Sequence, residues 1–481
     1  MRKFLAIVSA VLLAFLVTGG IYAWKGAELS KTGFFGLFPK TEKTSPQLPS
    51  TAELPEEVNL SYEDRMEKGD YFFERGFLTF ASNEYVRAAN LEPERIEPYL
   101  KLVKTHFELR NYKKALTNAE QVLRLDPNQP ETRLDMIRIY IRLSDFDTAK
   151  NLLDSYPVTD VPDARVLYYK GLLSALFGDH DAARKYLKEA QVASSDPDLS
   201  SHTGIILDAY QEFSFTQAAE DLYLSELLAR SLNKVAEYEM AIHLLKEVLR
   251  ERGDLRDGWI LLGFAYLNLE KYQFALTAFE KAYSLDSEWP TTQYFLGVTH
   301  KELEHFEDSI VFFNLALSNG FEPKLVIFRH LADLYFETQD YQKSVDAYEQ
   351  VLRINQDDVN SFVRPVWLYL DFTHEPQKAL KLAETAALTF PDSAMSYNLL
   401  GWSYAGTEDD EKAERNLKKA LELDPNLAAV YYNLGNLYAR QHRDQMALDA
   451  FQKAYDLDAN GSIGNLAAKA HNELLKKTLS N

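Results

Sequence analysis

The chain has 481 residues, with 52 basic against 72 acidic side chains and a formal net charge of −20. Such an acidic chain disfavours binding to nucleic acid or anionic lipid, so we expect its partners to be proteins or peptides. The sequence holds no cysteine, which excludes disulfides, thiolate zinc sites, cysteine nucleophiles and a lipoprotein anchor.

Residues 1–24 are predicted to form a transmembrane anchor or a signal peptide. Phe4–Ala23 contains no charged residue and follows two basic ones. A helix of this length measures about 30 Å, enough to cross the hydrocarbon core, and Tyr22 and Trp24 suit the headgroup region. The alternative is cleavage after the small residue Ala23. We expect the uncleaved anchor, because the apolar run is longer than the core of a typical signal peptide.

Residues 25–60 are predicted to be an extended linker, because prolines alternate there with serine, threonine and lysine. Both interpretations of the N-terminus place everything beyond the linker on the same side, since a very short basic tail stays in the cytoplasm. We therefore expect a single-pass protein of the cell membrane with its main part on the extracytoplasmic side. If the N-terminus is cleaved, the protein is secreted or periplasmic.

Two stretches near the C-terminus, Met395–Pro425 and Ala429–Ala459, are close to copies of one another. Tyr397 to Tyr404 aligns with Tyr431 to Tyr438 at an offset of 34 residues, and the same offset holds further along. A period of 34 residues with this pattern is typical of a helix–turn–helix repeat, which cannot bury its apolar face alone and therefore stacks on its neighbours.

On these residues the chain resembles the tetratricopeptide repeat family, and the resemblance covers most of the chain, with about eleven repeats between Ser61 and Gly461. It implies an all-α, right-handed superhelical solenoid of antiparallel helix pairs. Counting each repeat so that Gly401 is position 8, the family has small residues at positions 8, 20 and 27, where the two helices cross. The best match in the middle of the chain is formed by Trp259, Leu262, Gly263, Tyr266, Ala275, Phe279 and Ala282.

We expect repeats over residues 61–197 and 222–461, a helix inserted at residues 198–221, and a C-terminal capping helix at residues 462–481. Residues 198–221 fit no repeat phase. Ser155–Asp163 lacks the expected small residue and carries two prolines, so the second helix of that repeat should end early.

The resemblance also implies where a partner binds. In the family, the concave face is lined by positions 2, 5, 6, 9, 12 and 13 of each first helix. This mix of aromatic, amide and charged groups suits an extended peptide. The candidate protein-binding residues are Phe264, Tyr294, Val298, Arg329, Asp333, Asn398, Trp402, Tyr432, Asn433 and Asn436.

Signals of catalysis in the sequence are poor. It has no phosphate-binding loop, dinucleotide fingerprint or metalloprotease helix motif. His300 and His305 are five residues apart, about 140° around a helix, and so should not share a metal ion. We expect a non-enzyme with no cofactor, metal site or small-molecule substrate. The predicted function is a membrane-tethered scaffold or adaptor; the alternative is an accessory or regulatory subunit of an envelope enzyme system, such as glycan synthesis or secretion.

Overall fold

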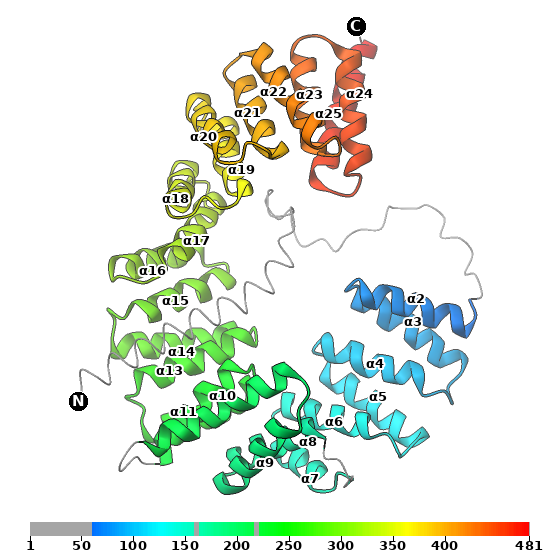
Figure 1. Cartoon of the computed structure of the whole chain (residues 1–481), viewed down its shortest axis with the longest axis vertical. Coiled ribbons are helices and arrows are strands. Elements are labelled where there is room, and N and C mark those ends of the chain that lie inside the picture. The colour runs from blue at the N-terminus through cyan, green and yellow to red at the C-terminus, as the bar shows by residue number, and fades with distance from the viewer. Residues whose placement is uncertain (1–59, 158–162, 216–220, 481) are drawn as a thin grey trace. The chain divides into compact units, whose positions relative to one another are not determined.

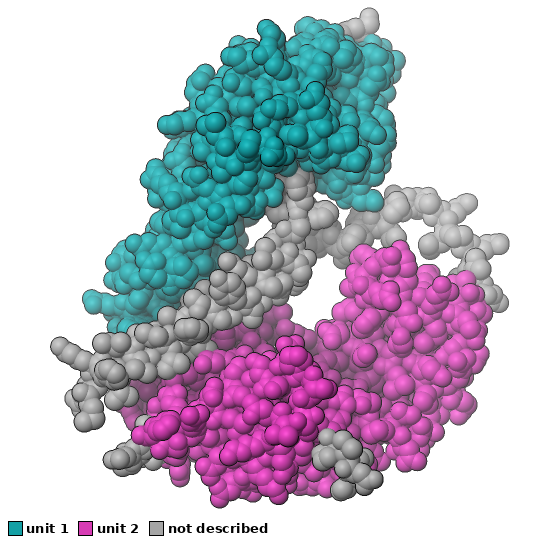
Figure 2. Space-filling model, in the orientation of Figure 1, with its two compact units in different colours: residues 1–44, 286–481 teal, residues 45–285 magenta. Residues whose placement is uncertain are grey.

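The computed structural model describes residues 60–157, 163–215 and 221–480. Within those ranges the chain forms 24 α-helices, one short 3-10 helix and no strand (Figure 1). The helices belong to two compact units, which we call in chain order the first unit (residues 45–285, magenta and labelled unit 2 in Figure 2) and the second unit (residues 286–481, teal and labelled unit 1). Each unit is described by itself.

The first unit stacks helices in antiparallel pairs, each helix packing against its partner and then against the next pair. Its helices are α2 (Tyr62–Glu74), α3 (Leu78–Leu91), α4 (Glu97–Glu108), α5 (Tyr112–Leu125), α6 (Pro130–Arg142), α7 (Phe146–Asp154), α8 (Ala164–Leu176), α9 (His180–Ala193), α10 (Pro197–Ser214), α11 (Asp221–Lys234), α12 (Tyr238–Glu251), α13 (Arg256–Asn268) and α14 (Tyr272–Leu285).

The second unit repeats the same arrangement. Its helices are α15 (Pro290–Glu302), α16 (Phe306–Ser318), α17 (Lys324–Glu337), α18 (Tyr341–Ile354), the 3-10 helix η2 (Val359–Phe362), α19 (Val363–Asp371), α20 (Pro376–Thr389), α21 (Ala394–Gly406), α22 (Asp410–Leu423), α23 (Ala428–Arg440), α24 (Asp444–Leu457) and α25 (Ser462–Ser480). The last helix, α25, packs against α23 and α24.

Glycine at position 8 allows the two helices of a pair to cross closely. A Cβ atom on Gly401 would lie 2.6 Å from Cγ of Leu417, and one on Gly435 would lie 2.5 Å from Cε1 of Phe451. Atoms essentially never approach so closely, so these positions accept no side chain. The prediction that small residues occupy the helix crossings is confirmed at these pairs.

The turns within the helix pairs, except that between α19 and α20, share a recurring backbone geometry. The residue at position 15 takes a positive φ, as Glu304 does at 61° and Glu408 at 63°. The next residue then donates its backbone N–H to the carbonyl five residues earlier, as His305 does to His300 at 2.9 Å. The prediction that His300 and His305 lie 140° apart on one helix is therefore wrong, because α15 ends at Glu302 and His305 already begins the next helix as its N-cap.

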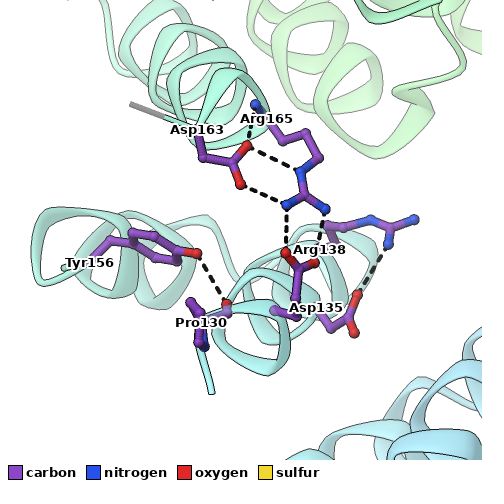
Figure 3. Close-up of polar contacts among 7 residues, drawn as sticks. Pro130, Asp135, Arg138, Tyr156, Asp163 and Arg165 are labelled. Carbon is purple, nitrogen blue, oxygen red and sulfur yellow. Dashed lines mark hydrogen bonds and ion pairs between the residues drawn. The ribbon is translucent and has the colours of Figure 1, made fainter. Parts of the chain in front are cut away.

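The helix α7 is shorter than the other second helices of the first unit and ends at Asp154, as the two prolines predicted. Salt bridges connect the flanking first helices in this region (Figure 3). The guanidinium of Arg165, on α8, contacts Glu131 of α6 at 2.7 Å and also pairs with Asp163. The Tyr156 hydroxyl donates to the Pro130 carbonyl at 3.1 Å. These polar contacts tie α6, α8 and the end of α7 together.

The helix α10 stands outside the pairing, because it contacts α9 on one side and α11 on the other, while α11 pairs with α12. It overlaps the range 198–221 where we predicted an inserted helix, but begins one residue earlier and ends at Ser214. Among the helices of the described ranges, none combines the length and apolar character needed to cross a bilayer. The predicted anchor and linker fall on residues 1–60, nearly all of them outside those ranges.

Candidate peptide-binding cleft

A cleft of about 400 Å³ opens in the second unit where the first helices α19, α21 and α23 follow one another. Apolar side chains and two amides meet charged groups along its wall, a composition typical of sites that hold a polar chain by a few apolar anchors. The lining residues are Leu370, Asp371, His374, Pro376, Trp402, Ala405, Gly406, Asn433, Asn436, Leu437 and Arg440.

Close contact between α19 and α21 shapes one wall of the cleft. Gly406 is the last residue of α21, and a Cβ atom there would lie only 2.5 Å from Cδ2 of Leu370. The glycine therefore lets the leucine approach the end of α21, where both residues line the cleft with Pro376. Trp402 lies one turn earlier on α21 and is partly buried, so its ring presents apolar surface beside them.

Two buried amides connect α21 to α23 beneath the cleft. Asn433 donates from Nδ2 to Oδ1 of Asn398 at 2.9 Å, and both residues are buried. A hydrogen bond between buried amides is costly to break, because either partner alone would be left unsatisfied. The pair fixes the two helices side by side, while Asn436, one turn along α23, is exposed and lines the opening.

The charged rim has both signs. Arg440 ends α23 and donates from Nη1 to the carbonyl of Ala405 at 2.5 Å, and its other nitrogen pairs with Asp410. Across the cleft, desolvation raises the pKa of Asp371, although a hydrogen bond from Trp367 and nearby His374 lower it. A cation held at one edge and a carboxylate at the other match a peptide segment that itself carries opposite charges.

The structure brings three of the predicted binding residues together, since Trp402, Asn433 and Asn436 all line the cleft. Tyr432 is adjacent in sequence but its ring packs near Phe451 of α24, with centroids 6.0 Å apart. Asn398 is buried under the cleft as the hydrogen-bond partner of Asn433.

Other predicted residues are placed where a partner cannot reach them or lie elsewhere. Tyr294 and Val298 are buried, at 3% and 7% exposure, and neither lines the cleft. The ring of Phe321, in the turn before α17, stacks on the Tyr294 ring with centroids 4.4 Å apart. Asp333 accepts a hydrogen bond from the Tyr348 hydroxyl at 2.5 Å and so faces α18.

Arg329 is exposed on α17, and Phe264 belongs to the first unit, where its ring lies 6.3 Å from that of Tyr238. Neither lines the cleft. Sequence reasoning missed Arg440 and His374, which do line it. Arg440 occupies position 13 of its repeat, one of the concave positions of the family, so the signal was present. His374 lies in a turn with φ of 55° and gave no such signal.

Comparisons with protein families match several separate parts of the chain. Models described as tetratricopeptide repeat match residues 106–176, 257–288, 330–358 and 428–460, and one described as TPR repeat matches residues 401–441. The matched segments lie in both units.

Individual proteins are similar to the chain at low identity. A Drosophila melanogaster protein named BBSome complex member BBS4 homolog is 23% identical over 42% of this chain and 44% of its own. The TPR repeat-containing protein MJ1428 of Methanocaldococcus jannaschii is 20% identical over 64% of this chain and 53% of its own. The chain thus spans about half the length of the curated relatives it matches.

Among solved structures, yeast Tom70 is 16% identical, with 87% of this chain and 96% of that one covered at a TM-score of 0.30. A score this low does not establish a shared arrangement of the whole chain. The family matches, together with the repeated helix pairs and their glycine crossings, support tetratricopeptide repeats in both units of the chain.

Proposed function

We propose that this protein is an interaction scaffold whose cleft between α19, α21 and α23 binds an extended segment of a partner protein. Tetratricopeptide repeat proteins generally mediate protein–protein interactions. The observation that carries the proposal for this chain is the cleft itself, which combines Trp402 with the amides of Asn433 and Asn436.

The chemistry of the cleft indicates the kind of segment that fits. An extended peptide exposes backbone N–H and C=O groups that lose water on binding and need new partners. Asn436 offers both a donor and an acceptor, and the Trp402 ring offers apolar surface for one side chain of the peptide. Because the whole chain carries a net charge of −20, long-range attraction favours a partner with a basic segment.

The second part of the proposal concerns the tether. Phe4–Ala23 supports a single span of the cell membrane, with the repeats held on the extracytoplasmic side by the linker of residues 25–60. In that arrangement the scaffold would gather partners near the membrane surface. A cleaved N-terminus would instead make the protein secreted or periplasmic, with the same cleft.

The cleft is tested by placing a photo-crosslinking amino acid at position 436 of the full chain and identifying the proteins captured in cells. The matched control carries the same amino acid at Gln452, which is exposed on α24, a second helix away from the cleft. We expect specific adducts from position 436 and not from position 452.

With the captured partner, the contribution of Trp402 to the binding affinity can be measured. Trp402→Ala should weaken binding by about 1–3 kcal/mol, because it truncates the largest apolar side chain of the cleft, whereas Gln452→Ala should leave the affinity unchanged. Isothermal titration with the captured segment gives both values. Equal affinity of the parent, Trp402→Ala and Gln452→Ala would show that this cleft is not the binding site.

A further inference from the structure

The turn between α15 and α16 gathers two imidazoles and a carboxylate at one point. Nδ1 of His300 lies 3.4 Å from Nδ1 of His305, and it lies 3.9 Å from Oδ2 of Asp308. One ligand atom from each of the three residues falls within 4.8 Å of the others. His300 is largely buried, whereas His305 and Asp308 are exposed, so an ion from solvent can reach the group.

The repeat fold itself creates this juxtaposition. The backbone bond from His305 N–H to the His300 carbonyl closes the turn through Glu304 and brings positions 11 and 16 next to each other. Asp308, at position 19, is the third residue of α16 and therefore lies beside its N-cap, His305. The ring of His300 stacks on Phe312 at 5.3 Å with an interplanar angle of 8°, which fixes the direction of its nitrogens.

The same backbone bond recurs in other turns of the described ranges, and among them only the α15–α16 turn carries histidine at both positions. The corresponding pairs elsewhere are Phe72 and Phe77, His106 and Asn111, Tyr140 and Asp145, Ser174 and Asp179, Leu232 and Glu237, Tyr266 and Lys271, Ala316 and Phe321, Tyr335 and Asp340, Leu368 and Thr373, Tyr404 and Asp409, and Tyr438 and Arg443. The geometry is common to the repeats, and the metal-binding side chains are particular to one of them.

The distances match those of a tetrahedral metal site. Two imidazole nitrogens bound to one Zn²⁺ at about 2.0–2.1 Å stand roughly 3.3 Å apart at the tetrahedral angle, close to the 3.4 Å observed here. The Asp308 carboxylate, whose Oδ2 lies 3.9 Å from Nδ1 of His300, must move closer to both imidazoles to complete the set, since ligand atoms at similar bond lengths are similarly spaced. The exposed side chain of Asp308 can do so by rotating.

We propose that His300, His305 and Asp308 bind one divalent transition-metal ion of the Zn²⁺ class. Two imidazoles and one carboxylate are a donor set that Zn²⁺ accepts, and they leave a fourth position for water or for a ligand from a partner. Binding places the ion between the two ring nitrogens, displaces a proton that they would otherwise share, and joins the end of α15 to the start of α16. This proposal is independent of the peptide-binding cleft.

The test uses the full chain, purified without a histidine tag and stripped with a chelator, and titrated with ZnCl₂ by calorimetry. We expect saturable binding of one ion per chain at this site and a rise in the thermal midpoint with metal, because the ion binds the folded state. Co²⁺ is the spectroscopic probe, since tetrahedral Co²⁺ shows strong visible absorption bands.

The variants distinguish this site from general metal binding at the surface. His305→Gln and Asp308→Asn change exposed side chains and should each weaken Zn²⁺ binding about tenfold or more and remove the tetrahedral Co²⁺ spectrum. His442→Asn, at an exposed left-handed position of another turn, is the control and should bind like the parent. Absence of saturable binding in the parent would overturn the proposal, as would a His305→Gln variant that binds Zn²⁺ and gives the Co²⁺ spectrum unchanged.

Discussion

At the scale of single residues, the packing of several helix pairs depends on glycine, which has no side chain, at position 8. The glycine at position 8 faces a large side chain from the second helix of its own pair. Gly263 faces Phe279, Gly297 faces Phe313, and Gly401 faces Leu417. In each case a Cβ atom added to the glycine would lie less than 3.0 Å from the facing side chain. The large residue fills the space that a side chain on the glycine would occupy. The two helices can therefore pack this closely only because the glycine carries a hydrogen atom in place of a side chain.

Gly401→Ala should therefore destabilise the protein by about 1–3 kcal/mol through overpacking, even though alanine is the better helix former. The added methyl group would meet Cγ of Leu417 at 2.6 Å and the Ala413 carbonyl at 3.1 Å, and the leucine is fully buried. The measurement is urea unfolding followed by circular dichroism.

Gly204→Ala, within α10, is the matched control for this prediction. Its Cβ atom would meet only the Gln191 amide, at 3.4 Å, so the helix propensity of alanine should make this variant equal to the parent or more stable by about 0.5–1 kcal/mol. If Gly401→Ala unfolded at the same urea concentration as the parent, close crossing would not be what position 8 requires.

At the scale of helices, a buried ion triad links two elements that are far apart in sequence. Arg142, at the end of α6, contacts Glu237 at 2.8 Å and Glu239 of α12 at 2.9 Å. Both carboxylates are almost completely buried. Burial raises the pKa of Glu237, while the charge and hydrogen bond of Arg142 lower it. The pKa of Glu237 should therefore rise when the Arg142 cation is removed.

Arg142→Met should destabilise the protein by about 3–5 kcal/mol near neutral pH, because it leaves two buried carboxylates without a cation. Without Arg142 the folded-state pKa of Glu237 rises further above its unfolded value. The folded protein then binds more protons than the unfolded one in that window, so stability falls as pH rises through it. The loss should be smaller near pH 5 than near pH 7.

Urea unfolding at both pH values checks this prediction, with Arg250→Met as the control because Arg250 is exposed and pairs only at the surface. We expect the control to stay within about 0.5 kcal/mol of the parent. A loss for Arg142→Met that is the same at both pH values would mean that the buried carboxylates do not carry the effect.

How much of this could be predicted from the sequence depends on how local the cause is. The early end of α7 and the glycine crossings follow from neighbours within one repeat, and both were predicted. The position of Trp402 on the cleft also follows from repeat position 9. The stacking of Phe321 on Tyr294 does not, because it depends on where the loop before α17 places Phe321. The Arg142 triad depends on how α6 packs against α12, helices of pairs that are not adjacent along the chain, which no single repeat encodes.

At the scale of the whole molecule, the proposed membrane anchor can be tested by fractionation. Full-length protein should sediment with membranes and resist extraction by alkaline carbonate, because Phe4–Ala23 is long enough to span the bilayer. A chain that begins at Leu60 should remain in the supernatant. Recovery of a mature protein that begins at Trp24 would show that the segment is a cleaved signal peptide.

The recurring turn has a consequence for engineering. The backbone bond of the turn brings positions 11 and 16 together whatever their side chains, as at Tyr404 and Asp409. The side chains at these two positions can therefore be replaced while the turn keeps its geometry. Histidine pairs introduced at successive turns would form a series of metal-binding sites along the stack. Each site would connect the two helices of one repeat without redesign of its core. A chosen part of the array could thus be made more rigid by addition of a metal ion.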